Sequence, residues 1–190
     1  MIPVLERAAG YALEAASGVT PELLGLPTPC RGWNLGMLLT HADESLAALH
    51  EGIGAGSVAL VGSAPVAADP VATFRERVTS LLRVSHASRA GLAPGDDGGD
   101  RVITIAGRPM TLRTLTAVAV LELAVHGWDV SAACGHRLPI PPALATDLLE
   151  LSWLLVPPAG RYPLFAPPVP VPGDASPGDR LTAFLGRRPG

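Results

Sequence analysis

Apolar residues recur at helical spacing in several stretches of the chain, and segments rich in glycine and proline separate these stretches. Residues three and four positions apart lie on one face of a helix, so each stretch predicts a helix with a buried face. Five main helices are expected, over residues 4–17, 34–50, 70–90, 114–133 and 141–154. The first would bury Leu5, Ala8, Ala12, Leu13 and Ala16, and the fifth would bury Leu144, Leu148, Leu151 and Leu155. The pattern therefore predicts an all-α fold.

The connections between these helices carry signals of their own. Residues 51–68 are so rich in glycine and alanine that a flexible connection is expected there. Residues 91–100 form an acidic, glycine-rich segment that lacks the spacing of a calcium-binding EF-hand, which favours a solvated loop. The β-branched residues of 101–105, followed by Ala106 and Gly107, predict a small hairpin that lies over the bundle.

A proline-rich segment follows the fifth helix. Its prolines predict an extended tail over 157–190 that packs on the bundle surface, with a short terminal helix over 177–185. A length of 190 residues fits one domain, and the sequence contains no internal repeat. The chain, 1–190, is thus predicted to be a single domain.

The helix expected over 114–133 has an unusual composition. It is apolar on nearly every face, which indicates burial on most sides, yet it carries Glu122, His126 and Asp129. Glu122 and His126 are one turn apart and share a face, which Asp129 extends by another turn. A carboxylate removed from water needs a partner or becomes neutral. A divalent metal ion would be such a partner and would also explain the imidazole.

A metal site needs a third ligand, and the chain has five histidines. Three of them fall near predicted helix ends or loops: His50, His86 and His136. His41 lies inside the predicted second helix, for which Asn34 is the expected N-cap. A hydrogen-bonded interior histidine is the ordinary alternative for His41. Facing helices of a bundle can nevertheless bring it to Glu122 and His126, which gives an open metal site with two imidazoles and one carboxylate.

Several segments of the chain resemble the DinB/maleylpyruvate isomerase superfamily. Residues 28–34 with 38–41, and residues 122–129, are similar to its two signatures, while 165–172 and 179–187 resemble the ending of a single-domain, actinobacterial, metal-binding subgroup. The resemblance implies a DinB-like four-helix bundle whose metal is held by His41, Glu122 and His126. It also implies mycothiol, a low-molecular-weight thiol, as cosubstrate or cofactor.

Other residues around this set have predicted roles. Asp129 is expected to orient His126 or to cap the helix rather than to bind the metal. Glu44, one turn after His41, is either a solvent-facing residue or a general base beside the metal. Arg31 and Arg113 are candidates to bind a carboxylate of the cofactor or substrate. The remaining conspicuous side chains are expected to pack around the site without reacting: Trp33, Trp128 and Cys30.

Composition limits where the protein works. All 14 basic residues are arginine, a bias expected of a high-GC genome such as those of many actinobacteria rather than of phosphate binding. A net charge of -3 offers no basic footprint for nucleic acid. No signal peptide and no uninterrupted apolar run of about 18 residues is present, so no membrane contact is expected. A cytoplasmic protein with Cys30 and Cys134 as reduced thiols is predicted, and a homodimer is one expected state.

The chemistry follows from an open-sided metal. A thiol bound to a divalent cation is deprotonated and becomes a nucleophile near neutral pH. Its addition to an electrophilic carbon gives S-conjugation, or isomerisation if the adduct rotates and then expels the thiol. By resemblance, the chain is predicted to be a metal-dependent and mycothiol-dependent transferase or isomerase acting on a small electrophile. Zinc is the expected metal, and nickel or iron also fit the ligand set.

The tail separates this chain from part of the family. Members that isomerise maleylpyruvate carry a further C-terminal α/β domain, whereas here the proline-rich tail follows the fifth helix, so a different substrate is expected. Two other functions fit the same ligand set. One is a metal-dependent cyclase or hydrolase of secondary metabolism that uses no thiol, and the other is a non-catalytic metal-binding stress protein.

Overall fold

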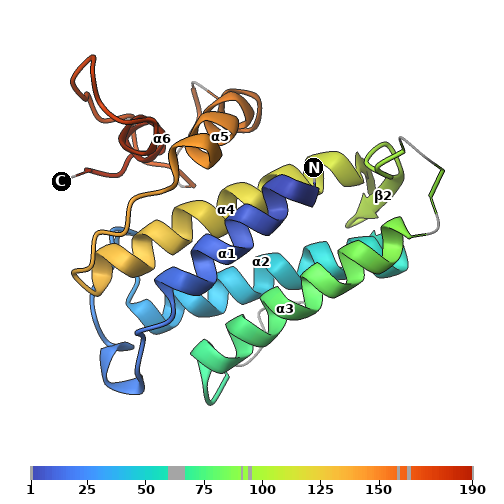
Figure 1. Ribbon diagram of the computed structural model, residues 1–190, viewed down its shortest axis with the longest axis horizontal. Helices are drawn as coiled ribbons and strands as arrows, with labels where there is room; N and C mark the ends of the chain where they lie inside the picture. The colour runs from blue at the N-terminus through green and yellow to red at the C-terminus, as the bar shows by residue number, and fades with distance from the viewer. Residues whose placement is uncertain are drawn as a thin grey trace.

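A computed structural model describes residues 2–59, 67–90, 92–93, 96–157, 159–161 and 164–189 (Figure 1). Over these residues the chain is mostly helical, which confirms the predicted fold class. The α-helices are α1 Ile2–Ala15, α2 Leu35–Ala55, α3 Pro70–Arg89, α4 Leu112–Ala133, α5 Pro142–Leu155 and α6 Pro177–Phe184. A 3-10 turn, η1, spans Pro21–Leu23, and the strands are β1 Ser57–Val58, β2 Val102–Ile105 and β3 Arg108–Thr111.

Helices α1 to α4 form the four-helix bundle (Figure 1). Helix α1 packs against α4 and α3, and α2 packs against the same two helices, so the order around the bundle is α1, α4, α2, α3. The beginnings of α1 and α4 and the ends of α2 and α3 meet at one end of the bundle, where they line a common cavity. Helices α2 and α3 therefore run in one direction, and α1 and α4 run in the other.

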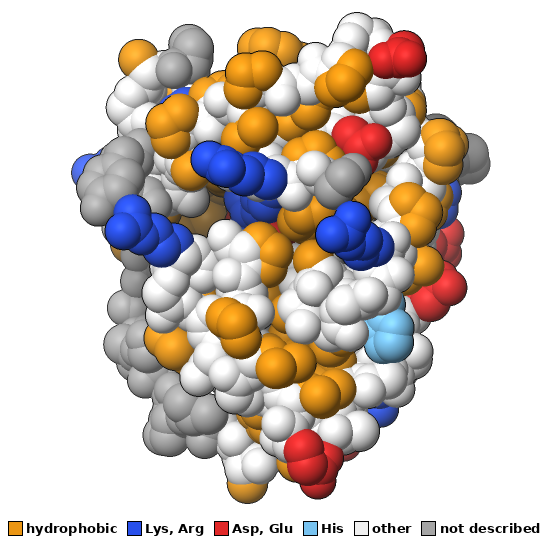
Figure 2. Space-filling view, turned by 90° about the vertical axis from the view of Figure 1, so that its left-hand side faces the viewer, with side chains coloured by type: hydrophobic (Ala, Val, Ile, Leu, Met, Phe, Trp, Pro, Cys, Tyr) orange, Lys and Arg blue, Asp and Glu red, His pale blue; other side chains and the backbone are white. Residues whose placement is uncertain are grey.

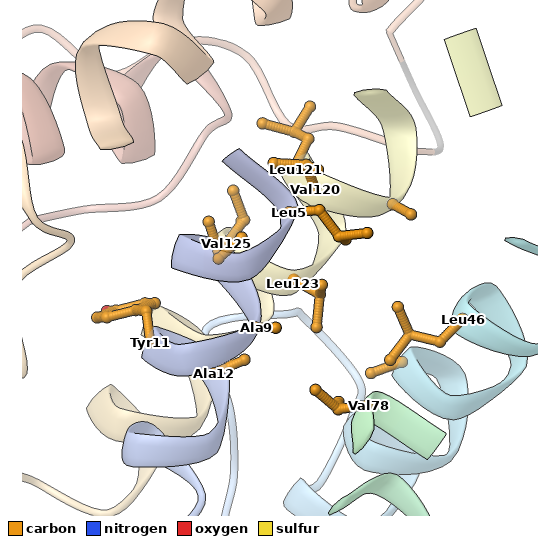
Figure 3. Close-up of a cluster of buried hydrophobic side chains, with 14 of the residues drawn as sticks. Leu5, Ala9, Tyr11, Ala12, Leu46, Val78, Val120, Leu121, Leu123 and Val125 are labelled. Atoms are coloured by element: carbon orange, nitrogen blue, oxygen red, sulfur yellow. The ribbon is translucent and has the colours of Figure 1, made fainter. Parts of the chain in front are cut away.

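Helix α4 is the central element of the core. Figure 3 shows its side chains Val120 and Leu123 gathered with Leu5 of α1, Leu46 of α2 and Val78 of α3. By length and composition α4 is apolar enough to cross a membrane, but 78% of its most apolar stretch is buried inside the bundle. Its high hydropathy is thus that of a core helix surrounded by other elements.

Helix α2 differs from its prediction at the C-terminal end. It begins as expected, because the Asn34 side chain accepts a hydrogen bond from the backbone N–H of Met37. It ends at Ala55 instead of fading near His50, with Gly56 in the left-handed conformation as its cap. The helix continues through Gly52, at a position where a Cβ would come within 2.7 Å of Leu115 Cδ2. Glycine serves here for close packing.

The predicted hairpin is present and is extended to a three-stranded sheet. Strands β2 and β3 pair antiparallel, and the Ala106–Gly107 turn between them has φ values of 49° and 76°, the positive values of a type I′ turn. Strand β1 pairs in parallel with β2, in the register Ser57 to Thr104. The expectation of a wholly flexible connection is therefore wrong for Ser57 and Val58, while residues 60–66 lie outside the described residues.

The C-terminal part of the chain adds a second layer beside the bundle (Figure 1). Helix α5 packs on α4 and α1, and α6 packs on α5. The expected inner face of α5 is correct for Leu144 and Leu148, which are buried, whereas Leu151 and Leu155 are only half-buried. In α1 the predicted Leu13 is likewise half-buried, and Ala9 and Tyr11 are buried in addition to the expected residues. The terminal helix, expected over 177–185, is confirmed as α6.

Candidate metal centre

A tight turn before α2 places two side chains at the centre. The backbone N–H of Thr28 donates to the Trp33 carbonyl, and the Trp33 N–H donates to the Cys30 carbonyl. The Thr28 hydroxyl accepts a hydrogen bond from the Cys30 N–H, and Gly32 supplies the positive φ of 84° that the turn requires. The turn thereby fixes Cys30 and Trp33 immediately before the helix that carries His41.

The structure brings together the three predicted ligands. His41 Nε2 lies 3.2 Å from Glu122 Oε2, and His126 Nε2 lies 3.0 Å from the same oxygen. Helix α2 provides His41, and facing helix α4 provides the other two from positions one turn apart. The ligand atoms of all three residues lie within 4.8 Å of one another. Side chains from two facing helices therefore converge as a metal site in a bundle requires.

The spacing of these atoms fits a small divalent cation. Ligands at about 2.0–2.2 Å from a tetrahedral zinc ion are separated from one another by about 3.3 Å. The carboxylate oxygen of Glu122 lies 3.0 and 3.2 Å from the two imidazole nitrogens, so only a slight expansion would be needed. The donor set is also suitable, because two imidazoles and one carboxylate bind zinc, iron or nickel and leave coordination positions free.

Asp129 fixes the orientation of His126. The His126 Nδ1–H donates to Asp129 Oδ2 over 2.9 Å, and Asp129 is completely buried. This hydrogen bond turns the opposite ring nitrogen, Nε2, toward Glu122. A carboxylate that holds the second nitrogen of a metal-binding histidine in this way sets its tautomer and its ring orientation.

Asp129 has further partners that the sequence did not reveal. Arg187, from the segment after α6, donates from Nη2 to Asp129 Oδ2 over 2.8 Å and from Nε to Oδ1 over 3.2 Å. The Cys30 thiol donates to Oδ2 over 3.2 Å. Arg187 lies in the segment 179–187 that resembles the ending of a family subgroup, but no pattern in the sequence pairs it with Asp129.

The electrostatics of the cluster follow from burial and pairing. Burial alone would raise the pKa of Glu122, but hydrogen bonds from the His126 and His41 rings hold it well below its usual range. Burial also opposes ionisation of Asp129, and hydrogen bonding by His126 together with the Arg187 charge lowers its pKa to about 2. For His126, burial would lower the pKa, but hydrogen bonds with Asp129, Cys30 and Glu122 raise it well above the usual range. The site therefore favours positive charge at His126.

The centre opens toward His41. The exposed fraction of the side chains rises from 10% for His126 to 23% for Glu122 and 37% for His41. Trp33 covers one side, with its ring centroid 4.7 Å from that of His41, and the two imidazoles meet nearly edge to face with centroids 5.2 Å apart. Ligands would therefore enter from the His41 side, beside the Trp33 ring.

A second group of potential ligands is better explained as support for the first. Cys30, His126 and Asp129 also have donor atoms within 4.8 Å of one another. Both oxygens of Asp129 already accept from the Arg187 guanidinium, which is a buried positive charge. A cation beside that guanidinium would be repelled, so this group stabilises His126 and is not a separate metal site.

The remaining predicted site residues lie at different distances from the centre. Arg31 is exposed on the turn that holds Cys30, and Glu44 is half-buried on α2, one turn after His41. Trp128 is half-buried and packs against the hydrophobic core. Arg113 is not brought to the centre, because it lies in the first turn of α4, about 13 Å along the helix from Glu122.

Arg113 belongs instead to the opposite end of the bundle. It donates to the carboxylates of Asp97 and Asp100 over 3.1 Å, in the described part of the acidic segment; residues 91, 94 and 95 lie outside the described residues. A cavity of about 300 Å³ opens there beside Ser85 and Thr116.

Figure 2 shows the other end of the bundle, where α4 ends and α2 begins. Arginine and apolar side chains are interspersed on this surface, and acidic side chains lie toward its edges.

The fold and the cluster together define a class of protein. A four-helix bundle with two histidines and a glutamate converging from facing helices is a candidate metal-binding bundle of the DinB type. The chain belongs to the mycothiol maleylpyruvate isomerase N-terminal domain family, whose model matches residues 5–131. This match confirms the resemblance noted in the sequence, and it includes His41, Glu122, His126 and Asp129 but neither α5, α6 nor Arg187.

Curated relatives extend the similarity beyond that range. Uncharacterized proteins of Mycobacterium tuberculosis, from strains CDC 1551 / Oshkosh and H37Rv, are each 27% identical to the chain over 184 residues. The alignment covers 96% of this chain and 94% of each relative. No solved structure gives a significant match.

Proposed function

We propose that this protein is a divalent-metal-dependent enzyme that uses mycothiol to attack a small electrophile. The observation that carries the proposal is the convergence of His41, Glu122 and His126 around one open position in a member of a mycothiol-related family. A divalent cation held by these groups, zinc in the first place, would lower the pKa of an incoming thiol so that the thiolate predominates near neutral pH.

The surrounding side chains provide the other functions that such a reaction needs. Asp129 keeps His126 in one orientation, and the Trp33 ring excludes water from one side of the His41 ring. Glu44 is the candidate to accept the thiol proton, because it lies one turn after His41 on the same helix. The sulfur then bonds to the electrophilic carbon of a conjugated carbonyl compound. The electron pair of the carbon–carbon double bond shifts to the bond with the carbonyl carbon, and the carbonyl electron pair moves to oxygen to give an enolate.

Two outcomes follow from this addition. Protonation of the substrate carbon by the acid form of Glu44 gives a stable S-conjugate. Rotation about the former double bond, followed by return of the electron pair and loss of the thiolate, gives a geometric isomer. The thiolate then regains its proton from the acid form of Glu44, which regenerates the thiol. The first outcome is a transferase reaction and the second is an isomerase reaction, and both balance without any oxidant or reductant.

The rim of the opening indicates the kind of electrophile. Met37 lies one turn before His41, and Val118 lies one turn before Glu122, and both are exposed although apolar. Arg31 is exposed on the adjacent turn and makes no side-chain hydrogen bond within the described residues. We infer a small conjugated carbonyl compound with an apolar body and a carboxylate that pairs with Arg31.

Mass spectrometry of product mixtures tests the proposal. Protein purified without a polyhistidine tag and loaded with zinc is incubated with mycothiol and a set of cis-configured unsaturated keto acids. A conjugate or isomer is expected, and it should disappear in His126→Ala. His86→Ala is the matched control, because His86 is exposed and pairs with Glu6 on the surface.

Three outcomes would contradict the proposal. Product formation in the absence of mycothiol would favour a cyclase or hydrolase that uses no thiol. Unchanged substrates with one equivalent of bound metal would favour a non-catalytic metal-binding protein. A metal content far below one equivalent after reconstitution would show that these residues do not form a metal site.

A further inference from the structure

The segment after α6 ends the helix in a way that fixes the backbone of Arg187. The Gly186 N–H donates to the Ala183 carbonyl over 3.0 Å, and the Arg187 N–H donates to the Thr182 carbonyl over 2.9 Å. These two bonds form a Schellman motif, in which Gly186 takes the left-handed position with a φ of 86°. Arg187 is therefore the second residue after the C-cap Leu185, directly after Gly186.

Close packing at Gly186 makes this geometry specific. A Cβ at this position would lie 2.8 Å from the carbonyl oxygen of Ala166, and the positive φ would strain any other residue. Helix α6 itself is anchored, because Leu181, Thr182 and Leu185 are buried. The direction in which the Arg187 side chain leaves the tail is thus set by the backbone and by packing.

The Arg187 side chain reaches inward to the support of the metal centre. It is 10% exposed, and it grips Asp129 through two parallel hydrogen bonds, from Nε to Oδ1 and from Nη2 to Oδ2. Its Nη1 donates to the Leu185 carbonyl, and its Nη2 also approaches Cys30 Sγ at 3.3 Å. A planar guanidinium held by this fork fixes the plane of the carboxylate, which a point charge would not do.

The contacts form a continuous chain from the tail to the predicted ligand. Arg187 holds the Asp129 carboxylate, Asp129 accepts from His126 Nδ1, and His126 Nε2 points to Glu122. We infer that Arg187 is a positioning residue of the metal centre, through which the C-terminal helix α6 sets the orientation of His126. The inference rests on the proposed metal site and adds to it a residue outside the range matched by the family.

A purely structural ion pair is the alternative role for Arg187. In that case its loss would weaken the attachment of α6 and lower the stability of the protein, but the His126 ring would keep its place. Metal affinity and the spectrum of the bound metal would then stay unchanged. A positioning role predicts that both change.

Binding measurements with the metal alone separate the two roles. Zinc affinity is measured by competition with a chromophoric chelator, and the visible spectrum is recorded after loading with cobalt. Arg187→Met is expected to bind zinc about 10–100-fold more weakly, the usual loss when the support of a ligand is removed, and to alter the cobalt spectrum. Arg188→Met is the matched control, because Arg188 is the exposed neighbour, and it should behave as the wild type.

A second set of variants tests whether Arg187 acts through Asp129. Asp129→Asn is expected to lose zinc affinity to a similar extent, and the double variant with Arg187→Met should be no worse than Asp129→Asn alone. Independent, multiplying losses would overturn the inference. Arg187→Lys keeps the positive charge but cannot make the two parallel hydrogen bonds of a guanidinium, so it should bind zinc with intermediate affinity. This variant also tests the inference if Arg187→Met does not fold.

The metal-free protein provides a readout that does not depend on the proposed function. The proton on His126 Nδ1 should give a downfield NMR resonance in the wild type, and this resonance should shift or broaden in Arg187→Met but not in Arg188→Met. A wild-type protein that binds no metal yet shows this difference would overturn the proposed function, while the orientation of His126 by Arg187 would stand. A wild-type resonance and wild-type zinc affinity in Arg187→Met would overturn the present inference only.

Discussion

Gly127 of α4 and Tyr11 of α1 lie so close together that a Cβ on Gly127 would be 3.0 Å from Tyr11 Cε1. The same Cβ would be 3.2 Å from the backbone Cα of Ala12, which cannot turn away. The glycine therefore allows α1 to approach α4 directly beside His126. Glycine inside a helix is unfavourable by about 1 kcal/mol relative to alanine, so its presence here reflects the contact.

Replacing this glycine should destabilise the protein. In Gly127→Ala, overpacking at a cost of about 1–3 kcal/mol is expected to exceed the gain in helix propensity, for a net loss of about 1 kcal/mol. Urea unfolding monitored by circular dichroism measures the change. Gly10→Ala is the control, because Gly10 of α1 has no neighbour within 4 Å of an added Cβ. That control should gain up to about 1 kcal/mol, and equal effects of the two variants would contradict the packing argument.

Variants of Glu122 and Glu44 should separate metal binding from turnover. Glu122→Gln removes the carboxylate that faces both imidazoles, so the variant is expected to bind zinc at least about 10-fold more weakly. Glu44→Gln should retain one equivalent of zinc but lose about 10²–10⁴-fold in kcat, the usual contribution of a general base. Elemental analysis and steady-state kinetics provide the two measurements. Full activity in Glu44→Gln would assign the solvent-facing role to Glu44.

The two predicted carboxylate-binding arginines should behave differently. Arg31→Met is expected to raise KM about 10-fold for a carboxylated electrophile, because an exposed charge-assisted contact contributes about 1.5 kcal/mol. Arg113→Met should leave KM and zinc affinity unchanged, because its guanidinium pairs with Asp97 and Asp100 at the other end of the bundle. The comparison uses the same substrate and its uncharged ester, for which neither variant should differ from the wild type. An increase of KM in Arg113→Met would indicate that the substrate binds at the Arg113 end of the bundle and not beside His41.

The phenol of Tyr11 should make stability depend on alkaline pH. Burial, together with the nearby Asp129 charge, raises the pKa of Tyr11 above its usual value near 10. The unfolded chain therefore loses this proton first as the pH rises, and the stability contributed by the protonated phenol is complete below about pH 10 and decreases above it. Tyr11→Phe should lower stability near neutral pH by about 1 kcal/mol, through loss of the bond to the Leu138 carbonyl. It should also flatten the decline above about pH 10 in denaturant titrations, and an unchanged slope would contradict this assignment.

The ligand cluster could be predicted because its signal is local. Glu122 and His126 are polar residues one turn apart in an otherwise apolar helix, and of the other histidines only His41 lies in a predicted helix away from its ends. The periodicity of the sequence is therefore enough to predict that His41 lies on a helix that faces Glu122 and His126. The hairpin was also predictable from a local signal, since Gly107, which tolerates positive φ, follows a β-branched segment.

Features that depend on contacts between distant segments could not be predicted. The glycines near the end of α2 resemble helix breakers in the sequence, but Gly52 is there because Leu115 and Ile103 pack against it. The parallel pairing of β1 with β2 joins residues that no local pattern connects. The bond between Arg187 and Asp129 is of the same kind, because it depends on how α6 docks on α5 and not on the residues around either partner.

The hydrogen bonds of Arg187 also have a consequence for biosynthesis. Arg187 follows Asp129 by 58 positions, so all three predicted ligands leave the ribosome well before the residue that steadies one of them. A nascent or prematurely terminated chain would present its imidazoles without that support and would retain metal poorly. Acquisition of the ion would accordingly be a late event in maturation, completed only after Arg187 has left the ribosome.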